Sequence, residues 1–388
     1  MKILMIVPQP FFTPRGTPLS VYYRAKALSD LGHEIDLLTY PIGEDVDIER
    51  VNIIRSPRLP FVYDIRIGPS IVKLMLDIPL FLKALLLLHR NKYEIVHAHE
   101  EAVFFCLLLN RIFGTRYIYD MHSSLPQQLE NFNFAKLKPL ISIFEYLERL
   151  SIARASAIIT ICKELELQVE KFGFAGKNEL IQNTLFSPIA FKNSPYNANL
   201  KNLINTAGKK VVLYAGTFEP YQGLEMYLES IGIVLRERKD LVFIFLGGTS
   251  EQVLEMRRKA EELGISDHVL FTGRLDVNPV REFIKEADVL VSPRLKGTNT
   301  PLKIYEYMAS RVPIVATSLR THTQELDGEC AFLRDPNPHD FAGGILECLE
   351  NEEEARRRAT NAYECYSNKY GEEIYKQRLE RVIGRVKT

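Results

Sequence analysis

The stretch Ser292-Pro-Arg-Leu-Lys-Gly-Thr-Asn-Thr-Pro-Leu-Lys-Ile-Tyr-Glu-Tyr-Met-Ala309 decides the fold of this chain. The apolar run Val289–Ser292 leads into it and is typical of a buried strand. A loop follows, and a helix is expected to begin near Pro301, because proline suits the first position of a helix. Thr300 stands where a capping side chain is favoured. The stretch therefore predicts a strand, a loop and a helix in that order.

The loop and the helix start carry groups that suit a phosphorylated ligand. Free backbone N–H groups in the first turn of a helix favour an anion such as a diphosphate. Arg294 and Lys303 would add positive charge, and the carboxylate of Glu306, one turn after Lys303, can accept hydrogen bonds from a ribose. The alternative interpretation is an ordinary capped helix with a Lys303–Glu306 pair on its surface. The residues alone leave both open.

The same alternation of apolar strands and helical patterns extends through the second half of the chain. Strands rich in Val and Ile with helices between them favour a parallel sheet covered on both faces. The expected strands are Lys210–Ala215, Leu241–Leu246, His268–Phe271, Val289–Ser292, Pro313–Ala316 and Ala331–Leu333. The expected helical segments are Glu219–Lys239, Ser250–Leu263, Val280–Ala287 and Leu302–Ser310, followed by a mostly helical tail from Pro338.

The first half repeats this organisation. Its expected strands are Lys2–Val7, Glu34–Thr39, Val51–Arg55, Glu94–Ala98, Arg116–Tyr119 and Ala157–Ile161, and its expected helices include Ser20–Leu31, Ile71–Leu88 and Leu137–Ala153. We expect an α/β protein with two Rossmann-like, doubly wound parallel-sheet domains facing a central cleft, where open parallel sheets bind ligands. The expected boundaries are domain 1–186, linker 187–209, domain 210–365, and a C-terminal helix in 366–388 that packs back toward the first domain.

The bulk composition excludes several classes of protein. Among 388 residues, 49 Lys and Arg balance 49 Asp and Glu, so no strong field points to nucleic acid. Five cysteines without a C-x-x-C pair argue against zinc and disulfide frameworks and favour a reducing, cytoplasmic compartment. The apolar start is interrupted by Pro8 and is interpreted as a buried strand, not as a signal peptide.

The segment Ile71–Leu88 is apolar enough to suggest a membrane. It contains Lys73, Asp77 and Lys83, and at about 100° per residue these charges fall within an arc of roughly 120°. A spanning helix would not carry such a stripe. The favoured interpretation is an amphipathic helix whose apolar face packs on a sheet. The alternative is that this face rests on the inner, cytoplasmic surface of a membrane.

The stretch around Glu306 resembles the signature of the retaining glycosyltransferases of family four. In that family a loop and helix read Pro-x-Lys/x-x-x-Glu-Ala/Tyr-Met-Ala, followed by x-x-Pro-Ile/Val-Val-Ala. The matching residues here are Pro301, Lys303, Glu306-Tyr-Met-Ala309 and Pro313-Ile-Val-Ala316. The resemblance implies the GT-B fold, a nucleotide-sugar donor whose ribose binds Glu306, and transfer with retention. It also implies that the donor's own phosphate assists the acceptor, so that no enzymatic nucleophile is needed.

Three positions depart from the family pattern. The family often has a second Glu eight positions before Glu306, where this chain has Thr298. It commonly has an Arg and a Lys that grip the donor phosphates, where this chain has Thr217 and Gln222. Burying a diphosphate without cationic partners is costly. We therefore expect Arg294 and Lys303 to replace the missing cations.

Other donor contacts are expected from the loops at the ends of the second half's strands. Arg274 lies in Phe271-Thr-Gly-Arg274, which resembles the family's base-contacting loop, and it is a further candidate for the phosphates. Backbone groups around Gly297–Thr300 are expected to replace the contacts of the missing Glu. The full set of expected donor-binding residues in this half is Gly216, Thr217, Arg274, Thr298, Asn299, Thr300, Pro301 and Glu306.

The first half carries the expected acceptor side. Pro14-Arg-Gly-Thr-Pro18 resembles the family's glycine-rich loop, so Gly16 and Thr17 are expected to approach donor phosphate or acceptor. His99 ends a strand in a Val-His-Ala-His run, whose second His faces the cleft in the family. His122 ends the next strand, where the family places a His near the acceptor and the transferred sugar. Such a His can hold an attacking or leaving oxygen.

The resulting hypothesis is sugar transfer from a nucleoside diphosphate to a hydroxyl of a saccharide or lipid-linked acceptor, in polysaccharide or lipid-linked glycan synthesis. His122, Arg294 and Lys303 are the expected catalytic residues, while Asp120 and Asn183 are interpreted as structural. No Asp-x-Asp metal motif appears, so neither a metal nor another cofactor is expected. Two alternatives stay open: a sugar-nucleotide epimerase, or a non-catalytic member of the fold that binds sugar nucleotides or acts as a scaffold.

Overall fold

The chain forms two compact units. The computed structural model describes residues 1–12, 16–60, 62, 70–124, 126, 138–182, 208–275, 277–297 and 299–387. The first unit holds the described residues up to 182 together with 372–387, and the second holds 208–371. Thr298, Asn183 and most of the expected linker lie outside the described residues.

The first unit is built on a seven-stranded parallel sheet. Its strands are β1 (Lys2–Val7), β2 (Glu34–Thr39), β3 (Val51–Arg55), β4 (Ile95–His99), β5 (Tyr117–Met121), β6 (Ala157–Thr160) and β7 (Asn178–Leu180). They lie in the order β3-β2-β1-β4-β5-β6-β7, and every pairing is parallel. The order in which successive strands are added to the sheet reverses between β1 and β4, and open sheets of this kind bind ligands at such a switch point.

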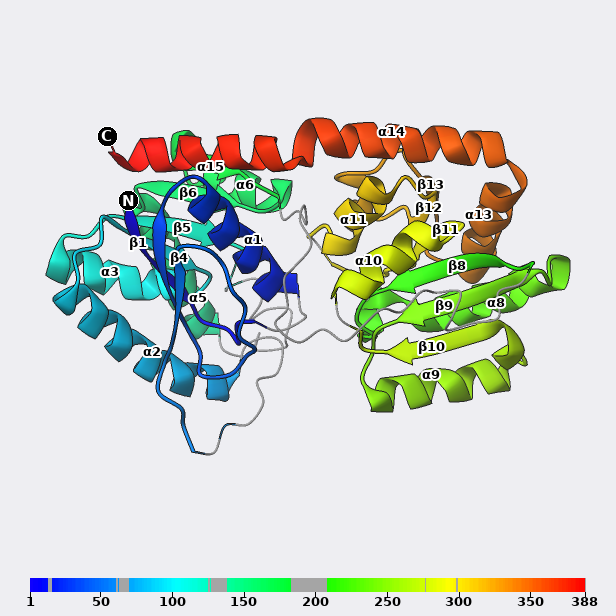
Figure 1. Ribbon diagram of the computed structural model, residues 1–388, viewed down its shortest axis with the longest axis horizontal. Helices are drawn as coiled ribbons and strands as arrows, with labels where there is room; N and C mark the ends of the chain where they lie inside the picture. The colour runs from blue at the N-terminus through cyan, green and yellow to red at the C-terminus, as the bar shows by residue number, and fades with distance from the viewer. Residues whose placement is uncertain are drawn as a thin grey trace. The chain divides into compact units, whose positions relative to one another are not determined.

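Helices cover both faces of this sheet. They are α1 (Gly16–Asp30), α2 (Ile71–Arg90), α3 (Ala102–Phe113), α5 (Lys138–Arg154), α6 (Lys163–Lys171) and α15 (Glu372–Lys387). Side chains of α2, α3, α5 and α6 share one core with the sheet, while α1 packs beside α15 (Figure 1). The end of the chain is held by polar contacts as well, since Lys376 Nζ lies 3.1 Å from Asp30 Oδ2 and Arg378 donates to Gln182 over 2.8 Å.

Helix α2 packs on the core of the first unit, as the favoured sequence interpretation expected, through Leu76, Leu80, Ala84 and Leu88. The charged Lys73 and Asp77 lie on the same packed side, where they contact Glu101 and Tyr40. A further row of apolar side chains is exposed, so the charged stripe does not mark the solvent side of the helix. Among the described residues no helix is both long and apolar enough to cross a membrane.

The second unit has a six-stranded parallel sheet with the same winding. Its strands are β8 (Lys210–Ala215), β9 (Leu241–Leu246), β10 (Val269–Gly273), β11 (Val289–Ser292), β12 (Ile314–Thr317) and β13 (Phe332–Arg334). Their order is β10-β9-β8-β11-β12-β13, with the switch between β8 and β11. Its helices are α8 (Leu224–Glu237), α9 (Ser250–Glu262), α10 (Val277–Glu286), α11 (Leu302–Ser310), α12 (Arg320–Thr323), α13 (Pro338–Glu350) and α14 (Glu352–Tyr370).

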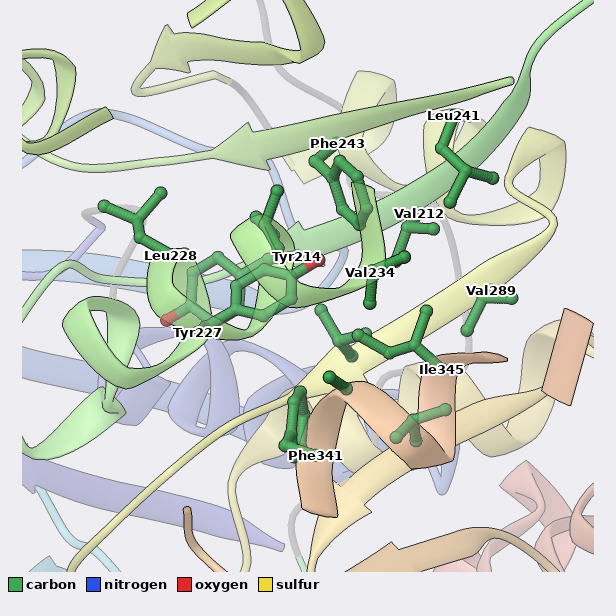
Figure 2. Close-up of a cluster of buried hydrophobic side chains, with 14 of the residues drawn as sticks. Val212, Tyr214, Tyr227, Leu228, Val234, Leu241, Phe243, Val289, Phe341 and Ile345 are labelled. Carbon is green, nitrogen blue, oxygen red and sulfur yellow. The ribbon is translucent and has the colours of Figure 1, made fainter. Parts of the chain in front are cut away.

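Strict alternation along the strands builds two cores in the second unit. On β8, Val212 and Tyr214 enter the core under α8 and α13, while Leu213 enters the core under α10, α11 and α14. Figure 2 shows the first of these cores, where Tyr227 of α8 and Phe341 of α13 meet the strand side chains. Both faces of the sheet are therefore buried, as near-continuous Val and Ile runs predict.

The expected fold class, an α/β protein with two doubly wound parallel sheets, is confirmed by these two units. Local differences remain. Helix α1 begins at Gly16, four residues before the expected Ser20, so Gly16 and Thr17 belong to its first turn rather than to a loop. Strand β7 and helix α6 were not expected, because β7 has only three residues and shows no apolar alternation.

Candidate functional site

The switch point of the second sheet brings two cations together. Gly216 follows β8 and Arg294 follows the neighbouring strand β11, while Lys303 lies in the first turn of α11. These are the carboxyl ends of adjacent strands at a change of winding, which is the usual ligand position in such a sheet. The sequence expectation that Arg294 and Lys303 act at one place is therefore consistent with the topology.

Lys303 is a buried cation. Its side chain is 8% exposed, its Nζ donates to Gln222 Oε1 over 3.2 Å, and Nζ stands 4.0 Å from the centre of the Tyr214 ring. Burial, together with repulsion from Arg294, lowers the pKa of Lys303 well below its usual range. The surroundings of Lys303 thus disfavour its charged form.

Arg294 lies beside it with its guanidinium partly buried. Nε donates to the backbone oxygen of Lys296 over 2.7 Å, Nη1 lies 3.4 Å from the backbone oxygen of Asn299, and the group stacks 5.1 Å from the centre of the Tyr221 ring. Burial lowers the pKa of Arg294 as well. Its contacts orient the guanidinium but supply no negative charge.

Neither cation has a carboxylate partner within the described parts of the chain. The ion pairs found there join neither Lys303 nor Arg294 to an Asp or Glu, and their nearest polar neighbours are an amide, two tyrosines and backbone oxygens. Buried charges in proteins are normally paired. Two adjacent, desolvated and uncompensated cations form a binding place for a polyanion such as a diphosphate.

Two glycines leave room for these cations. Gly216 has φ +155°, and a Cβ there would lie 2.9 Å from the Tyr214 hydroxyl and 3.4 Å from Lys303 Nζ. Gly297 has φ +131°, and a Cβ there would collide with the guanidinium of Arg294. Both backbones adopt conformations that favour glycine, so the close approach of the loops to the cations depends on these residues. Thr217, beside Gly216, is exposed and accepts through its backbone oxygen from Tyr214 over 2.7 Å.

Glu306 pairs with an arginine that the sequence did not single out. Its Oε1 accepts from Arg281 Nε of α10 over 3.0 Å, and both side chains are only 13–15% exposed. Burial raises the pKa of Glu306, and Arg281 partly offsets this effect. The alternative of a surface Lys303–Glu306 pair is wrong, since the two residues turn to different partners.

The start of α11 differs slightly from expectation. Pro301 is the N-cap and Leu302 the first helical residue, so the expected cap by Thr300 is wrong. The loop before it is fixed from both sides, because Thr321 donates to the backbone oxygen of Asn299 over 2.8 Å. The helix itself is anchored under the site by Tyr307, whose hydroxyl accepts from the backbone N–H of Ala215 over 2.9 Å. The first-turn N–H groups of α11 thus keep a fixed position.

His322 is a buried neighbour of this site that sequence reasoning missed. Its Nδ1 lies 2.8 Å from the backbone oxygen of Thr317, so Nδ1 carries the proton and Nε2 accepts from the Ser292 hydroxyl over 2.8 Å. Burial lowers its pKa to about 3, with further lowering by Lys303 and Arg294. Since Ser292 and Thr317 end neighbouring strands, their polar ends were the signal that a buried partner was needed.

Arg274 lies apart from the two cations. It is exposed at the end of β10, three strands away from β11 in the sheet order. It lines a pocket of about 740 Å³ together with residues of α9 and the end of β10; the other lining residues are Gly248, Thr249, Ser250, Val253, Leu254, Arg257, Phe271, Thr272 and Gly273. The structure therefore does not bring Arg274 into contact with Arg294 or Lys303, and its expected phosphate role is not supported by proximity.

The first unit holds a second buried polar cluster at its own switch point. His99 ends β4 and His122 follows β5, and His99 Nδ1 lies 3.2 Å from His122 Nε2. Between them and the core lies Asp120, which is fully buried. Its Oδ2 accepts from Arg24 Nε and from His97 Nε2, each over 2.9 Å, and His122 Nε2 lies 3.3 Å from Oδ1.

Charge compensation inside this cluster is strong. Burial alone would raise the pKa of Asp120, but Arg24, followed by His99 and His122, holds it well below its usual range. Burial lowers the pKa of His99 well below its usual range, so His99 is neutral near neutral pH. Sequence reasoning missed Arg24 of α1, whose guanidinium stacks 5.0 Å from the centre of the Tyr375 ring of α15.

His97, His99 and Asp120 also offer ligand atoms within 4.8 Å of one another, the geometry of a possible metal site among the described residues. Asp120 Oδ2 is already bonded to the guanidinium of Arg24, and a bound cation would compete with that contact. The residues therefore fit an internal ion-pair network better than a metal site. Gly16 and Thr17, in the first turn of α1, lie on the helix that supplies Arg24.

Comparison with known proteins gives matches in both halves. The family described as Glycosyltransferase Family 4 matches residues 14–185, and the family described as Glycosyl transferases group 1 matches residues 209–351. Phosphatidyl-myo-inositol mannosyltransferase of Mycobacterium leprae (strain TN) is 21% identical over 339 residues, which span 86% of this chain and 83% of that protein. These matches lie over both switch points.

Solved structures share the complete architecture. The structure of Anabaena HepE in complex with UDP and glucose has a TM-score of 0.75 at 18% identity and covers 99% of each chain. Sucrose-phosphate synthase from Thermosynechococcus elongatus has a TM-score of 0.76 at 20% identity and covers 99% of this chain and 98% of that chain. The similarity to these structures establishes the fold, and the two family matches indicate a glycosyltransferase.

Proposed function

For this chain, a GT-B glycosyltransferase by its family matches and its fold, we propose transfer of a sugar from a nucleoside diphosphate to a hydroxyl acceptor with retention of configuration. The observation that carries the proposal is the pair of buried cations, Arg294 and Lys303, without a carboxylate partner among the described residues. A donor diphosphate would supply the missing negative charge. Retention is inferred from the family resemblance.

Lys303 would supply positive charge close to the position where this chain lacks the family's second cation. The family commonly has a Lys where this chain has Gln222, and Lys303 Nζ lies 3.2 Å from Gln222 Oε1. The positive charge near position 222 would therefore come from α11.

The remaining donor contacts are assigned from the same geometry. Glu306 would hold the ribose through its carboxylate, which Arg281 orients. Backbone groups of Gly216, Asn299 and the first turn of α11 would bind the diphosphate. Thr217, Thr300 and Pro301 border this place, and Thr298 belongs to the same proposal from the sequence alone.

In the reaction, the acceptor oxygen forms a bond to the anomeric carbon as the bond from that carbon to the diphosphate breaks. The bonding electrons leave with the diphosphate, and the acceptor proton passes to the departing phosphate oxygen. Arg294 and Lys303 stabilise the charge that develops on this oxygen. We expect no cofactor, and because two cations supply the positive charge, we expect activity to persist with a metal chelator.

The first unit would supply the acceptor side. Neutral His99 can hydrogen-bond sugar or acceptor hydroxyls without adding charge, and His122, which lies beside His99 and Asp120, can contact the same hydroxyls. Gly16 and Thr17 would border this side from α1. We propose a saccharide or lipid-linked acceptor at the cytoplasmic face of a membrane, since one relative is by name a phosphatidyl-myo-inositol mannosyltransferase. Polysaccharide or lipid-linked glycan synthesis would be the pathway class.

A panel of radiolabelled sugar nucleotides tests this proposal. Wild-type protein is incubated with each donor and a mixed acceptor fraction, and we measure bound donor, labelled product and released nucleoside diphosphate. Glu306→Ala should lower the affinity for the donor by about ten- to a hundredfold, because it removes a charge-assisted hydrogen bond. The matched control is Glu262→Ala, an exposed glutamate of α9, which should leave donor binding unchanged.

The outcomes separate the remaining alternatives. Binding with product formation supports the transferase, and an NMR spectrum of the product gives the anomeric configuration. Conversion of the donor sugar without transfer indicates an epimerase, and binding without any conversion indicates a non-catalytic member of the fold. If no donor binds and Glu306→Ala behaves like Glu262→Ala, both the site and the function proposed here are wrong.

A further inference from the structure

Helix α2 exposes a row of large apolar side chains. Ile78 and Leu74 are 63% and 62% exposed, Leu82 is 58% exposed and Met75 is 51% exposed. On a helix these positions, together with Leu86, occupy one side of the cylinder. Scattered apolar residues on a surface need no explanation, but a continuous side of one helix marks an interaction surface.

The inward orientation of the polar residues shows that this exposure is built into the fold. Lys73 Nζ lies 3.8 Å from Glu101 Oε1, with both side chains less than a fifth exposed. Asp77 Oδ1 accepts from the Tyr40 hydroxyl over 2.6 Å. Rotating α2 to bury its apolar side would break both contacts and place Lys73 and Asp77 in solvent. The apolar side therefore faces outward because the charged side has specific partners beneath it.

The helices that pack beside α2 also expose large apolar side chains. Helix α3 packs between α2 and α5 through the ring pairs Phe81–Phe105 and Phe104–Phe144, at 5.4 and 5.9 Å between ring centres. Figure 1 shows α2, α3 and α5 along the same side of the first unit. We call their exposed apolar side chains the α2 face; they are Leu74, Met75, Ile78, Leu82, Leu86, Leu108, Ile112, Ile143 and Tyr146.

Positive charge accompanies the α2 face. Exposed basic residues on these helices and just beyond α2 are Arg90, Lys92, Arg111, Arg149 and Arg154. None of these five forms an ion pair with a described residue, and the exposed acidic residues of the same described helices and of the segment just beyond α2 are Glu94 and Glu145. A protein interface would be expected to deplete charge at its core, whereas an apolar row with unpaired basic residues fits the interfacial region and the anionic headgroups of a lipid surface.

We propose that the α2 face docks on an anionic lipid surface, with α2 lying in the plane of the membrane interface. The exposed Leu and Ile side chains enter the boundary between headgroups and acyl chains, and the basic residues contact anionic headgroups. The proposal deepens the membrane-side localisation proposed above and rests on it for its biological context. Lipid binding needs neither donor nor acceptor, so its failure is distinguishable from failure of the transferase proposal.

Flotation of the full-length protein with vesicles tests the α2 face. One set of vesicles contains phosphatidylcholine alone, and the other contains phosphatidylglycerol mixed with phosphatidylcholine. Wild type should bind the anionic vesicles and bind the neutral ones much more weakly, and added salt should weaken the binding. The double variant Ile78→Glu/Leu82→Glu should bind the anionic vesicles at least about tenfold more weakly, because it places charge in the apolar row.

Matched controls separate docking from a general effect of added charge. Leu254→Glu changes a leucine of α9 that is 70% exposed in the second unit, and it should bind vesicles like wild type. Arg90→Glu/Lys92→Glu should weaken binding to anionic vesicles about tenfold, since each basic residue contributes through the surface potential. Circular dichroism confirms that each variant is folded.

Three results would overturn the proposal. One is that wild type floats with neither kind of vesicle. Another is that Ile78→Glu/Leu82→Glu binds anionic vesicles as strongly as Leu254→Glu does. The third is that wild type self-associates in light scattering without lipid and the double variant does not, because a second copy of the chain would then be the occupant of the α2 face.

Discussion

The two units bury charge at equivalent places in their sheets and compensate it in different ways. In the first unit, the Asp120 carboxylate after the switch point is bonded to Arg24 and His97, with His122 beside it. In the second unit, Lys303 and Arg294 meet only an amide, aromatic rings and backbone oxygens among the described residues. A buried carboxylate pairs with a buried guanidinium in the first cluster, whereas no described carboxylate pairs with Lys303 or Arg294 in the second.

This difference shows which part of each cluster serves structure and which serves a ligand. A buried ion pair is costly to break, because the remaining charge is left without compensation. A buried charge without a partner lowers stability by itself and persists where a ligand completes it. The first cluster should therefore behave as part of the fold, and the second as a site that becomes favourable only when an anion is bound.

The largest effect is expected from removing the Asp120 charge. Asp120→Asn leaves the Arg24 guanidinium buried without its carboxylate, so the first unit should lose about 3–5 kcal/mol of stability. A two-domain chain need not unfold in one step, so the measurement is peptide-resolved hydrogen exchange, read over β4 and β5 and over β8 and β11. Protection should fall in the first pair of strands and stay unchanged in the second.

A double-mutant cycle tests the ion pair itself. Arg24→Met alone should also destabilise the first unit, and Arg24→Met/Asp120→Asn should cost less than the sum of the two single changes, since no charge is left unpaired. Additive losses would show that Arg24 and Asp120 do not compensate each other. The inference that buried charge is compensated within the first unit would then be wrong.

A smaller effect of opposite sign is expected in the second unit. Lys303→Met keeps much of the side-chain volume and removes a buried, uncompensated charge. Ligand-free protein should therefore gain about 1–2 kcal/mol of stability in the second unit, because apolar replacements of buried charges are often stabilising. The same exchange measurement reads this gain over β8 and β11. Loss of protection there would mean that Lys303 is a structural residue.

The smallest expected effect is the pH dependence of the stability gained in Lys303→Met. The pKa of folded Lys303 lies well below the value of about 10.4 in an unfolded chain, so between these values the unfolded chain holds a proton that the folded chain has released. Its contribution to folding therefore becomes more favourable as pH rises through this window, by at most about 1.4 kcal/mol per pH unit. The stability advantage of ligand-free Lys303→Met over wild type should shrink as pH rises from about 7 to 9, read from the exchange protection of β8 and β11 after correction for the intrinsic exchange rate at each pH. An advantage that is independent of pH contradicts the assignment to Lys303.

The sequence predicted what local patterns determine. Apolar runs such as Lys210–Ala215 identified strands, and their alternation with helices predicted the doubly wound class. The segment around Glu306 predicted a site at the strand ends. Contacts between distant positions were not predictable in this way, and they include the bond from Lys303 to Gln222 and the pairing of Arg281 with Glu306.

Helix α2 shows why an amphipathic pattern alone can mislead. The pattern predicted the packing of the helix but not that Lys73 and Asp77 lie on the packed side, because their partners Glu101 and Tyr40 come from other elements. The start of α1 was misplaced for a related reason: Gly and Pro near residues 14–18 are typical of a loop, yet the helix includes Gly16. His322 and Arg24 were missed because a single buried polar residue carries no local signature.

The account depends most directly on whether a diphosphate completes the charge of the second unit. Isothermal titration of UDP and GDP into wild type, Lys303→Met and Lys296→Met measures this. Lys296 is exposed on the same loop as Arg294, so it is the matched control for loss of a lysine charge. We predict that the preferred nucleoside diphosphate binds Lys303→Met at least about tenfold more weakly than wild type and binds Lys296→Met within about threefold of wild type. Equal affinities for wild type and Lys303→Met would contradict the account.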